Sequence, residues 1–248
     1  MKPAELRRHQ NRGKYDLESV SSVFADSFMA HVSYVDDGLP QCLPMIALFH
    51  TIGDETAVYL HGHPSARLME LVKQSGGADG ELPEKDKIKV CIAATKVDGL
   101  VLSSAPNGHT FNYQSAVIHG ECSLVQDRSI KQDIMRGVTN HIVAGRWEDV
   151  NPVSSFQISL VCVVRVDILS LSLKSRSGVP GIQPRNIEKD GKDRDEPVWT
   201  GVVPLYDVLD EPVASGLTDA AKVPEGLRTF IGKRNEKHRN YSLRAAKI

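Results

Sequence analysis

The chain has 248 residues, of which 41% are hydrophobic and 25% charged, and its formal net charge at pH 7 is −1. These values are ordinary for a globular protein with a large buried core, and the balanced charge argues against a nucleic-acid-binding protein. No stretch is long and apolar enough for a transmembrane helix, and the polar N-terminus lacks the apolar centre of a secretory signal. We therefore expect a cytoplasmic protein that binds neither nucleic acid nor membranes.

Four cysteines lie far apart in the sequence and form no CxxC pair: Cys42, Cys91, Cys122 and Cys162. Each lies in an apolar or alternating run, which is typical of buried thiols on strands in a reducing compartment. Metal binding would require four distant strands to converge, so we predict no metal site.

The N-terminal part predicts a helix followed by a β-hairpin. Residues 17–28 carry Val20, Val23, Phe24 and Phe28 at helical spacing. The period then changes to two, which predicts strands at residues 31–35 and 41–50 joined by an Asp-Asp-Gly turn. Pro44 lies inside the second strand and cannot donate to a ladder, so it marks an edge, a bulge, or backbone that faces something other than a strand.

The next stretch predicts a strand at residues 57–60, a tight turn, and a helix that opens at Pro64. The N-terminus of such a helix is a site for anions, because its N–H groups are free and its dipole is positive there. Ser65 and Arg67 lie in the first turn and point to a phosphate. Alternatively, Arg67 faces water and Ser65 caps the turn. His63 either caps the helix or faces the anion.

Further strands and a helix follow, joined mainly by hairpins. We expect strands at residues 88–95, 112–125 and 158–173, a hairpin turn at Asp98-Gly99, and a helix at residues 127–143. Six or seven strands joined in this way predict a mainly β (α+β) fold, with an antiparallel sheet closed into a small barrel. No GxGxxG follows the first strand, which argues against a dinucleotide-binding α/β fold.

The character of the chain changes after Lys174. A loop rich in Gly and Pro is followed by a charged stretch, a short apolar segment, and a basic tail from residue 222 onwards. This tail holds eight Lys and Arg against two Asp and Glu, and we interpret it as solvated or facing a partner. We place a domain boundary between residues 180 and 181. The final Ala246-Lys247-Ile248 has the form of a peroxisomal address, so peroxisomal localisation is the alternative to the cytoplasm.

Seven motifs occur in an order that resembles one family. They are RR…NRGKYD at residues 7–16, YLHGHPSAR at 59–67, DGLVLS at 98–103, HTFNYQSAVIHG at 109–120, AGRW at 144–147, KSRSGVP at 174–180 and VWTGVVPL at 198–205. They resemble the pyridoxamine-5′-phosphate-oxidase-like, FMN-binding split-barrel superfamily. Within it they are most similar to the flavin-nucleotide-binding branch that includes the Nim nitroimidazole-resistance proteins. The resemblance spans roughly residues 5–205.

The resemblance implies an antiparallel split barrel of six or seven strands with a few flanking helices. It also implies a homodimer that binds FMN in a groove at the subunit interface. The HGHPSAR turn matches the family's phosphate-binding corner, which assigns Ser65 and Arg67 to the FMN phosphate, and His63 is a further candidate for cofactor binding. The segment Pro44-Met45-Ile46-Ala47 matches the strand whose backbone follows the isoalloxazine edge. His61 would lie beside the flavin, where it could donate a hydrogen bond or relay a proton.

The resemblance assigns further contacts to the second half of the chain. Gln114 and Ser115 match positions on the phosphate side, where Nim-like sequences usually have Arg in place of Gln114. Loss of that charge weakens FMN binding by about 1–2 kcal/mol if the contact is charge-assisted. Lys174 and Arg176 either compensate for it or form a solvated basic loop. Trp199 is either a packing residue or part of the wall over the flavin.

These residues predict an FMN-binding oxidoreductase that reduces a small planar substrate with electrons from NAD(P)H or another donor, with His61 as its candidate catalytic residue. Two alternatives stay open. One is a flavin or haem carrier or sensor without turnover. The other is an oxidase of pyridoxamine or pyridoxine 5′-phosphate, although the C-terminal region lacks the Arg- and His-rich arrangement that such an oxidase would use.

Overall fold

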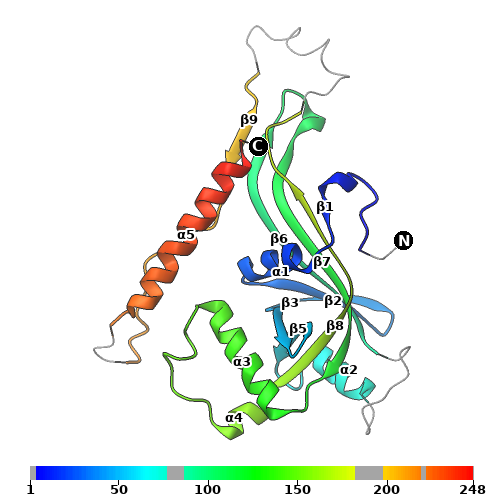
Figure 1. Ribbon diagram of the computed structural model, residues 1–248, viewed down its shortest axis with the longest axis vertical. Coiled ribbons are helices and arrows are strands. Elements are labelled where there is room, and N and C mark those ends of the chain that lie inside the picture. Colours follow the sequence, from blue (N-terminus) through cyan, green and yellow to red (C-terminus); the bar gives the residue numbers. More distant parts are fainter. Residues whose placement is uncertain (1–3, 77–86, 182–197, 219–221, 248) are drawn as a thin grey trace. The chain divides into compact units, whose positions relative to one another are not determined.

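The computed structural model describes residues 4–76, 87–181, 198–218 and 222–247 (Figure 1). Its internal contacts divide the chain into two compact units. The first unit holds residues 1–95 and 115–174, and the second holds residues 96–114 and 175–248. The second unit therefore takes one segment from the middle of the sequence in addition to the C-terminal part.

One antiparallel sheet provides the framework, and its pairing order is β3-β2-β6-β7-β8-β5-β4. The bounds of these strands are β2 (Ala30–Asp36), β3 (Leu39–Met45), β4 (Leu48–Ile52), β5 (Glu55–Gly62), β6 (Lys89–Leu102), β7 (Thr110–Leu124) and β8 (Cys162–Arg176). Two short strands join it: β1 (Gly13–Lys14) pairs with β8, and β9 (Gly201–Pro204) pairs with β6. The predicted mainly β fold is confirmed, but the described pairings end at β3 and β4 and do not close into a barrel.

Helices of the first unit cover both faces of β5. They are α1 (Leu17–Asp26), α2 (Arg67–Ser75) and α3 (Arg128–Ile142), while the short α4 (Ser155–Ser159) packs against α3. Alternate residues of a strand point to opposite faces, and in β5 Val58 and Leu60 belong to the core that includes α1 and α2. Ala57 and Tyr59 pack with α3 in a second core. Because β5 is buried on both faces, its C-terminal end is a well-fixed starting point for α2.

Two predicted boundaries in the β-sheet are wrong. The Asp98-Gly99 pair is not a hairpin turn, because β6 runs through it and Gly99 pairs with Pro204 of β9. A Cβ at Gly99 would lie 3.1 Å from the carbonyl oxygen of Val203, so glycine here serves the close approach of two strands. The last long strand begins at Cys162 and not at residue 158 as predicted, because residues 158 and 159 end the short helix α4, which a capping box between Ser154 and Gln157 begins.

Pro44 lies near the end of β3, opposite His31 of β2. Because β3 is the last strand of the described pairing order, the edge position expected for this proline is confirmed. Predicted as one strand, residues 41–50 are in fact divided between β3 and β4. Ile46 and Ala47 lie between the two strands, so their backbone groups are outside the ladder.

Gly120 of β7 lies against the backbone of β8. A Cβ at this position would be 2.5 Å from the carbonyl oxygen of Asp167 and 2.5 Å from Cγ1 of Val166. We expect Gly120→Ala to lower the free energy of unfolding by about 2 kcal/mol, because a strand backbone cannot move aside as a flexible side chain can. Urea denaturation would measure it, with Gly232→Ala as control, since a Cβ there meets open space. Equal midpoints for Gly120→Ala and wild type would contradict the expectation.

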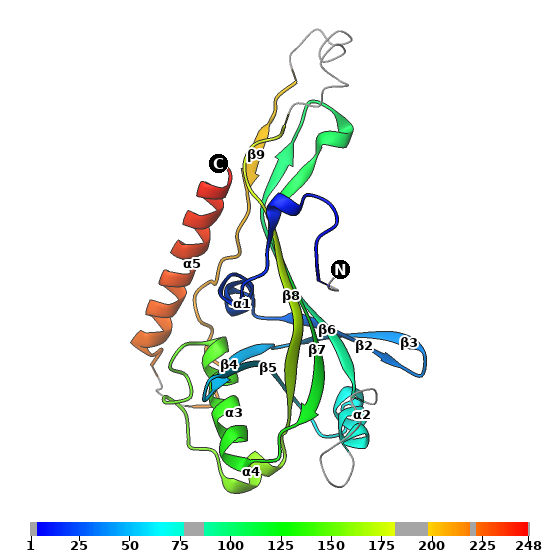
Figure 2. The ribbon, with the colours of Figure 1, turned by 45° about the vertical axis from the view of Figure 1, so that its right-hand side comes forward.

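In the second unit the basic tail, which we expect to be solvated or to face a partner, is helical. It forms α5 (Glu225–Ala245), which packs along β9, as both ribbon views show (Figures 1 and 2). Ser242 donates a hydrogen bond of 2.6 Å to the carbonyl oxygen of Leu205, and the Asn235 side chain bonds the backbone N–H and carbonyl of Leu209. No helix in the described ranges is long and apolar enough to span a membrane.

Two single-turn 3₁₀ helices complete the described elements. They are η1 (Gln10–Arg12) in the first unit and η3 (Pro106–Gly108) in the second.

Candidate functional site

The turn between β5 and α2, which we call the β5–α2 corner (residues 61–67), exposes the N-terminus of a helix. The Ala66 N–H bonds the carbonyl oxygen of His63 at 2.9 Å and closes the turn. The helix begins at Arg67, three residues later than predicted, with Ala66 as its N-cap and no side-chain cap. Leu68 and Met69 are fully buried and anchor the first turn. The first backbone N–H groups of α2 are thus available to an anion.

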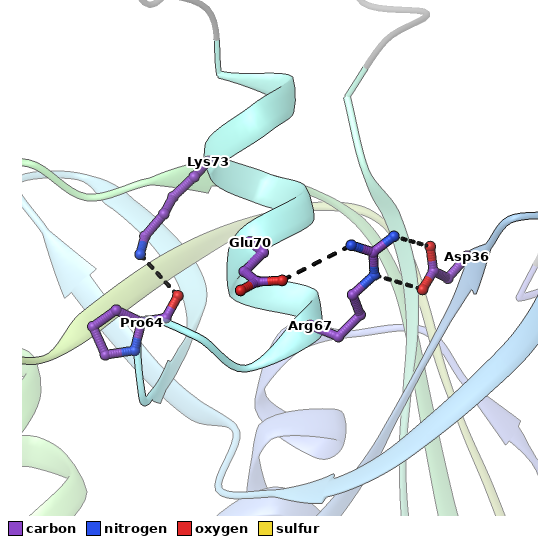
Figure 3. Close-up of polar contacts among 5 residues, drawn as sticks. All are labelled: Asp36, Pro64, Arg67, Glu70 and Lys73. Carbon is purple, nitrogen blue, oxygen red and sulfur yellow. Dashed lines mark hydrogen bonds and ion pairs between the residues drawn. The ribbon is translucent and has the colours of Figure 1, made fainter.

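Arg67 does not point freely into solvent. Its Nε and Nη2 donate to the two carboxylate oxygens of Asp36 at 2.7 and 2.8 Å (Figure 3). Its Nη1 lies 3.8 Å from the Glu70 carboxylate. The hydrogen bond from Arg67 holds the pKa of Asp36 below its usual value, so this carboxylate is charged at neutral pH. One edge of the guanidinium is therefore occupied, and the side chain is still 51% exposed.

Lys73 adds a second positive charge on the same helix. Its Nζ donates a hydrogen bond of 2.9 Å to the carbonyl oxygen of Pro64, which ties the second turn of α2 back to the corner (Figure 3). Two cations, Arg67 and Lys73, are thus matched by two carboxylates, Asp36 and Glu70. The four side chains carry no net formal charge, and the positive end of the helix dipole, worth roughly half an elementary charge, remains.

His63 and Ser65 bond each other at the start of the corner. The Ser65 N–H donates to Nδ1 of His63 at 3.2 Å, and the Ser65 hydroxyl lies 2.6 Å from the same nitrogen. Nδ1 accepts the backbone bond, so the proton of the neutral ring is assigned to Nε2. His63 is not the N-cap of α2, since Ala66 takes that position. The Ser65 hydroxyl is thus held in place at the exposed corner.

His61 lies one residue before the end of β5, opposite Val163 of β8. Its Nδ1 is buried and has no hydrogen-bond partner among the described residues. Burial lowers the pKa of the ring below its ordinary value of 6.5, so the imidazole is neutral at pH 7. A buried ring nitrogen without a partner costs free energy unless a bound group satisfies it. This residue therefore fits a site that a cofactor completes.

A pocket of about 230 Å³ lies beside Ala47, where β3 gives way to β4. It is lined by Ser21, Ser22 and Ala25 of α1, by Ala47, Leu48 and Phe49, and by His141 of α3. The Nε2 of His141 is bonded to the carbonyl oxygen of Ser27 at 2.9 Å, which fixes the ring. Ala47 is 4% exposed. The pocket is large enough for a small planar molecule next to the segment Pro44–Ala47.

The remaining predicted site residues have contacts of other kinds. Ser115 accepts a hydrogen bond of 3.4 Å from Thr95, and Lys174 pairs with Gly13 in the ladder of β1 and β8. In the second unit, Gln114 donates to the buried Asp98 at 3.2 Å, and Trp199 is 65% exposed. Arg176 donates to Asn112 and to the carbonyl oxygens of Gly178 and Val179. Cofactor contacts of these five side chains stay predictions.

Sequence reasoning missed Asp36, which it assigned only to a hairpin turn. The contact between Asp36 and Arg67 joins residues 31 positions apart, and no local pattern links them. The available signal was the position of Arg67 at a helix N-terminus, where a cation needs an anionic partner. The carboxylate of Asp36, in the same chain, is an anionic partner of Arg67.

An open antiparallel sheet with a short strand–turn–helix corner and a partly buried histidine beside it defines a protein of the split-barrel class. A family model described as pyridoxamine 5′-phosphate oxidase matches residues 16–175. The chain belongs to this family, as the sequence motifs predicted. No curated protein matches the sequence.

Several solved structures are similar to this one. The flavocytochrome Anf3 from Azotobacter vinelandii is 25% identical over 91% of this chain and 94% of its own, with a TM-score of 0.72. The FAD and heme binding protein from Mycobacterium smegmatis is 20% identical over 89% and 97%, with a TM-score of 0.71. A putative 5-nitroimidazole antibiotic resistance protein from Bacteroides thetaiotaomicron is 19% identical over 65% and 86%, with a TM-score of 0.48. The first two similarities cover far more of the chain than the family model does.

Proposed function

We propose that the protein is a flavin-dependent oxidoreductase that binds the flavin phosphate at the β5–α2 corner. The observation that carries the proposal is the N-terminus of α2, which has no side-chain cap and lies in the motif that matches the family's phosphate-binding turn. Ser65 and the outer edge of Arg67 add side-chain donors. FMN is the flavin that the family resemblance implies, and a homodimer with the cofactor at its interface is the assembly.

When bound, the flavin supplies hydride and electron transfer, and the chain supplies position and protons. The backbone groups of Ile46 and Ala47, which lie outside the ladder, bond the edge of the isoalloxazine ring. The pocket beside Ala47 admits a small planar substrate, with NAD(P)H or another donor as the source of electrons. The neutral ring of His61 holds or delivers a proton at its buried Nδ1.

A second candidate is a flavocytochrome that carries haem as well as flavin. It is favoured by the similarity to Anf3 at 25% identity, which covers 91% of this chain and thus includes residues beyond the family model. His61 would hold the haem iron, because a neutral imidazole with an unpartnered nitrogen is the form that binds iron. Such a protein could also act as a carrier or sensor without turnover.

The absorbance spectrum of the purified protein tests both candidates. Paired flavin bands, with the flavin type determined after heat release, would support the first, and an added Soret band would support the flavocytochrome. Bleaching of the flavin bands by NAD(P)H under anaerobic conditions would establish reductase chemistry, and oxidation of pyridoxamine 5′-phosphate would indicate the oxidase instead. A colourless protein that takes up neither added flavin nor haem would contradict the proposal.

Substitution of His61 distinguishes its two proposed roles, which are proton transfer during flavin chemistry and ligation of haem iron. We expect His61→Gln to slow flavin reduction or reoxidation by roughly 10-fold, because the amide cannot exchange a proton at neutral pH. Flavin content should stay close to that of wild type, while a haem ligated by His61 would be lost together with its Soret band. The exposed His31 of β2 supplies the control His31→Gln. Full activity and an unchanged spectrum in His61→Gln would exclude both roles.

A further inference from the structure

Asp36 is held rigidly at the tip of the β2–β3 hairpin. It pairs with Leu39 across a two-residue turn in which Asp37 and Gly38 have φ angles of 49° and 75°. Positive φ at both central positions is the signature of a tight hairpin turn that matches the twist of its strands. The hairpin therefore fixes the backbone that carries Asp36, and with it the partner of Arg67.

The two side chains of the Asp36–Arg67 ion pair differ in their exposure to solvent. The side chain of Asp36 is 17% exposed, whereas that of Arg67 is 51% exposed. The Asp36 carboxylate is thus mostly covered, and both of its oxygens accept hydrogen bonds from Nε and Nη2 of Arg67. The rest of the guanidinium is exposed to solvent. An anion at the N-terminus of α2 meets an arginine whose charge Asp36 already balances, with the carboxylate of Glu70 3.8 Å from Nη1.

FMN and FAD differ in the charge of the phosphate group that would bind at the β5–α2 corner. The terminal phosphate of FMN is a monoester, which carries about −1.5 to −2 at pH 7 because its second pKa is near 6. The corresponding phosphate of FAD is joined by an anhydride bond to the adenosine phosphate, so it carries a single negative charge and the second charge of the diphosphate lies on its neighbour. A corner whose four charged side chains sum to zero provides backbone N–H groups and a partial positive charge, which suit one negative charge better than two.

We propose that Asp36 determines which flavin this protein binds: by pairing with Arg67 it favours the singly charged riboflavin-side phosphate of the FAD diphosphate over the phosphate monoester of FMN. The inference rests on the flavin-binding function proposed above. It changes the expectation from FMN to FAD, and it assigns a specificity role to a hairpin residue outside the family's phosphate-binding motif. Asp36 acts through Arg67 and is a positioning residue.

The test compares the dissociation constants of FMN and FAD for flavin-free protein. Asp36→Asn keeps the size of the side chain and one acceptor for Arg67, and removes the charge. We expect FMN affinity to rise on the order of 10-fold and FAD affinity by about 2-fold, so that the preference shifts about 5-fold towards FMN. Asp36→Glu retains the charge and should restore the wild-type preference, which loss of hairpin structure could not explain.

Asp37→Asn is the matched control. It removes the same charge from the neighbouring position, and asparagine tolerates the positive φ of this residue. The preference should stay within about 2-fold of wild type, since electrostatic effects without a direct contact are small at the surface.

The outcomes distinguish this inference from the proposed function. A wild-type protein that binds neither FMN nor FAD would overturn the flavin-binding function and the selectivity together. Flavin binding with the same FMN-to-FAD preference in Asp36→Asn and Asp37→Asn would overturn the role of Asp36 alone. A wild-type preference for FMN would overturn it as well.

Discussion

Arg67→Ala should lower flavin affinity by about 100-fold, which corresponds to about 2.7 kcal/mol. The substitution removes the outward-facing donors of the guanidinium, and it also leaves the Asp36 carboxylate without its partner beside the bound phosphate. Both effects weaken binding of an anion. Isothermal titration of flavin-free protein with FMN and FAD would measure the loss, and the thermal midpoint would show whether the fold is retained.

A double-mutant cycle separates the loss of the Arg67 donors from the repulsion by the unpartnered Asp36 carboxylate. If the unbalanced carboxylate matters, adding Asp36→Asn to Arg67→Ala should recover part of the lost affinity, on the order of 5-fold. Arg136→Ala is a suitable control, because this exposed arginine of α3 also pairs with a carboxylate, Glu148, and lies outside the corner. Flavin content in Arg67→Ala equal to that of wild type would show that the phosphate binds elsewhere.

The framework of the first unit could be predicted because its signals are local. Alternating residues identified β2 and β7, and the apolar spacing of α1 and α3 matched the helices to within a few residues. The motif at residues 59–67 gave the position of the corner, since a strand, a tight turn and a helix follow one another without interruption.

Features that depend on distant contacts could not be predicted. The pair Asp98-Gly99 has the sequence of a turn, and only the approach of β9 explains why it lies in a strand. The helix α5 gave no signal, because the buried positions His238, Ser242 and Ala245 are polar or small and leave no apolar stripe. The partner of Arg67 is likewise set by the placement of a hairpin and not by any local spacing.

The second unit contains a buried polar contact that should dominate its stability. Asn112 of β7 is completely buried, and its side-chain amide donates a hydrogen bond of 3.1 Å to the carbonyl oxygen of Ala245 at the end of α5. Its oxygen accepts from Nη1 of Arg176. The Ala245 carbonyl also accepts from the Gly178 N–H at 2.7 Å. The Asn112 side chain thus connects β7, the end of α5 and the last residue of β8.

Asn112→Ala is therefore expected to lower the free energy of unfolding of this unit by about 3 kcal/mol. The loss exceeds that of an ordinary hydrogen bond, because a partly buried guanidinium loses an acceptor while a methyl group fills little of the space. Hydrogen exchange of the α5 amides should accelerate by about 100-fold or more, since the end of the helix is released. Asn151→Ala, at an exposed position, serves as the control and should stay within about 0.5 kcal/mol of wild type. Unchanged exchange in α5 of Asn112→Ala would mean that its contacts with β9, and not the asparagine, hold the helix in place.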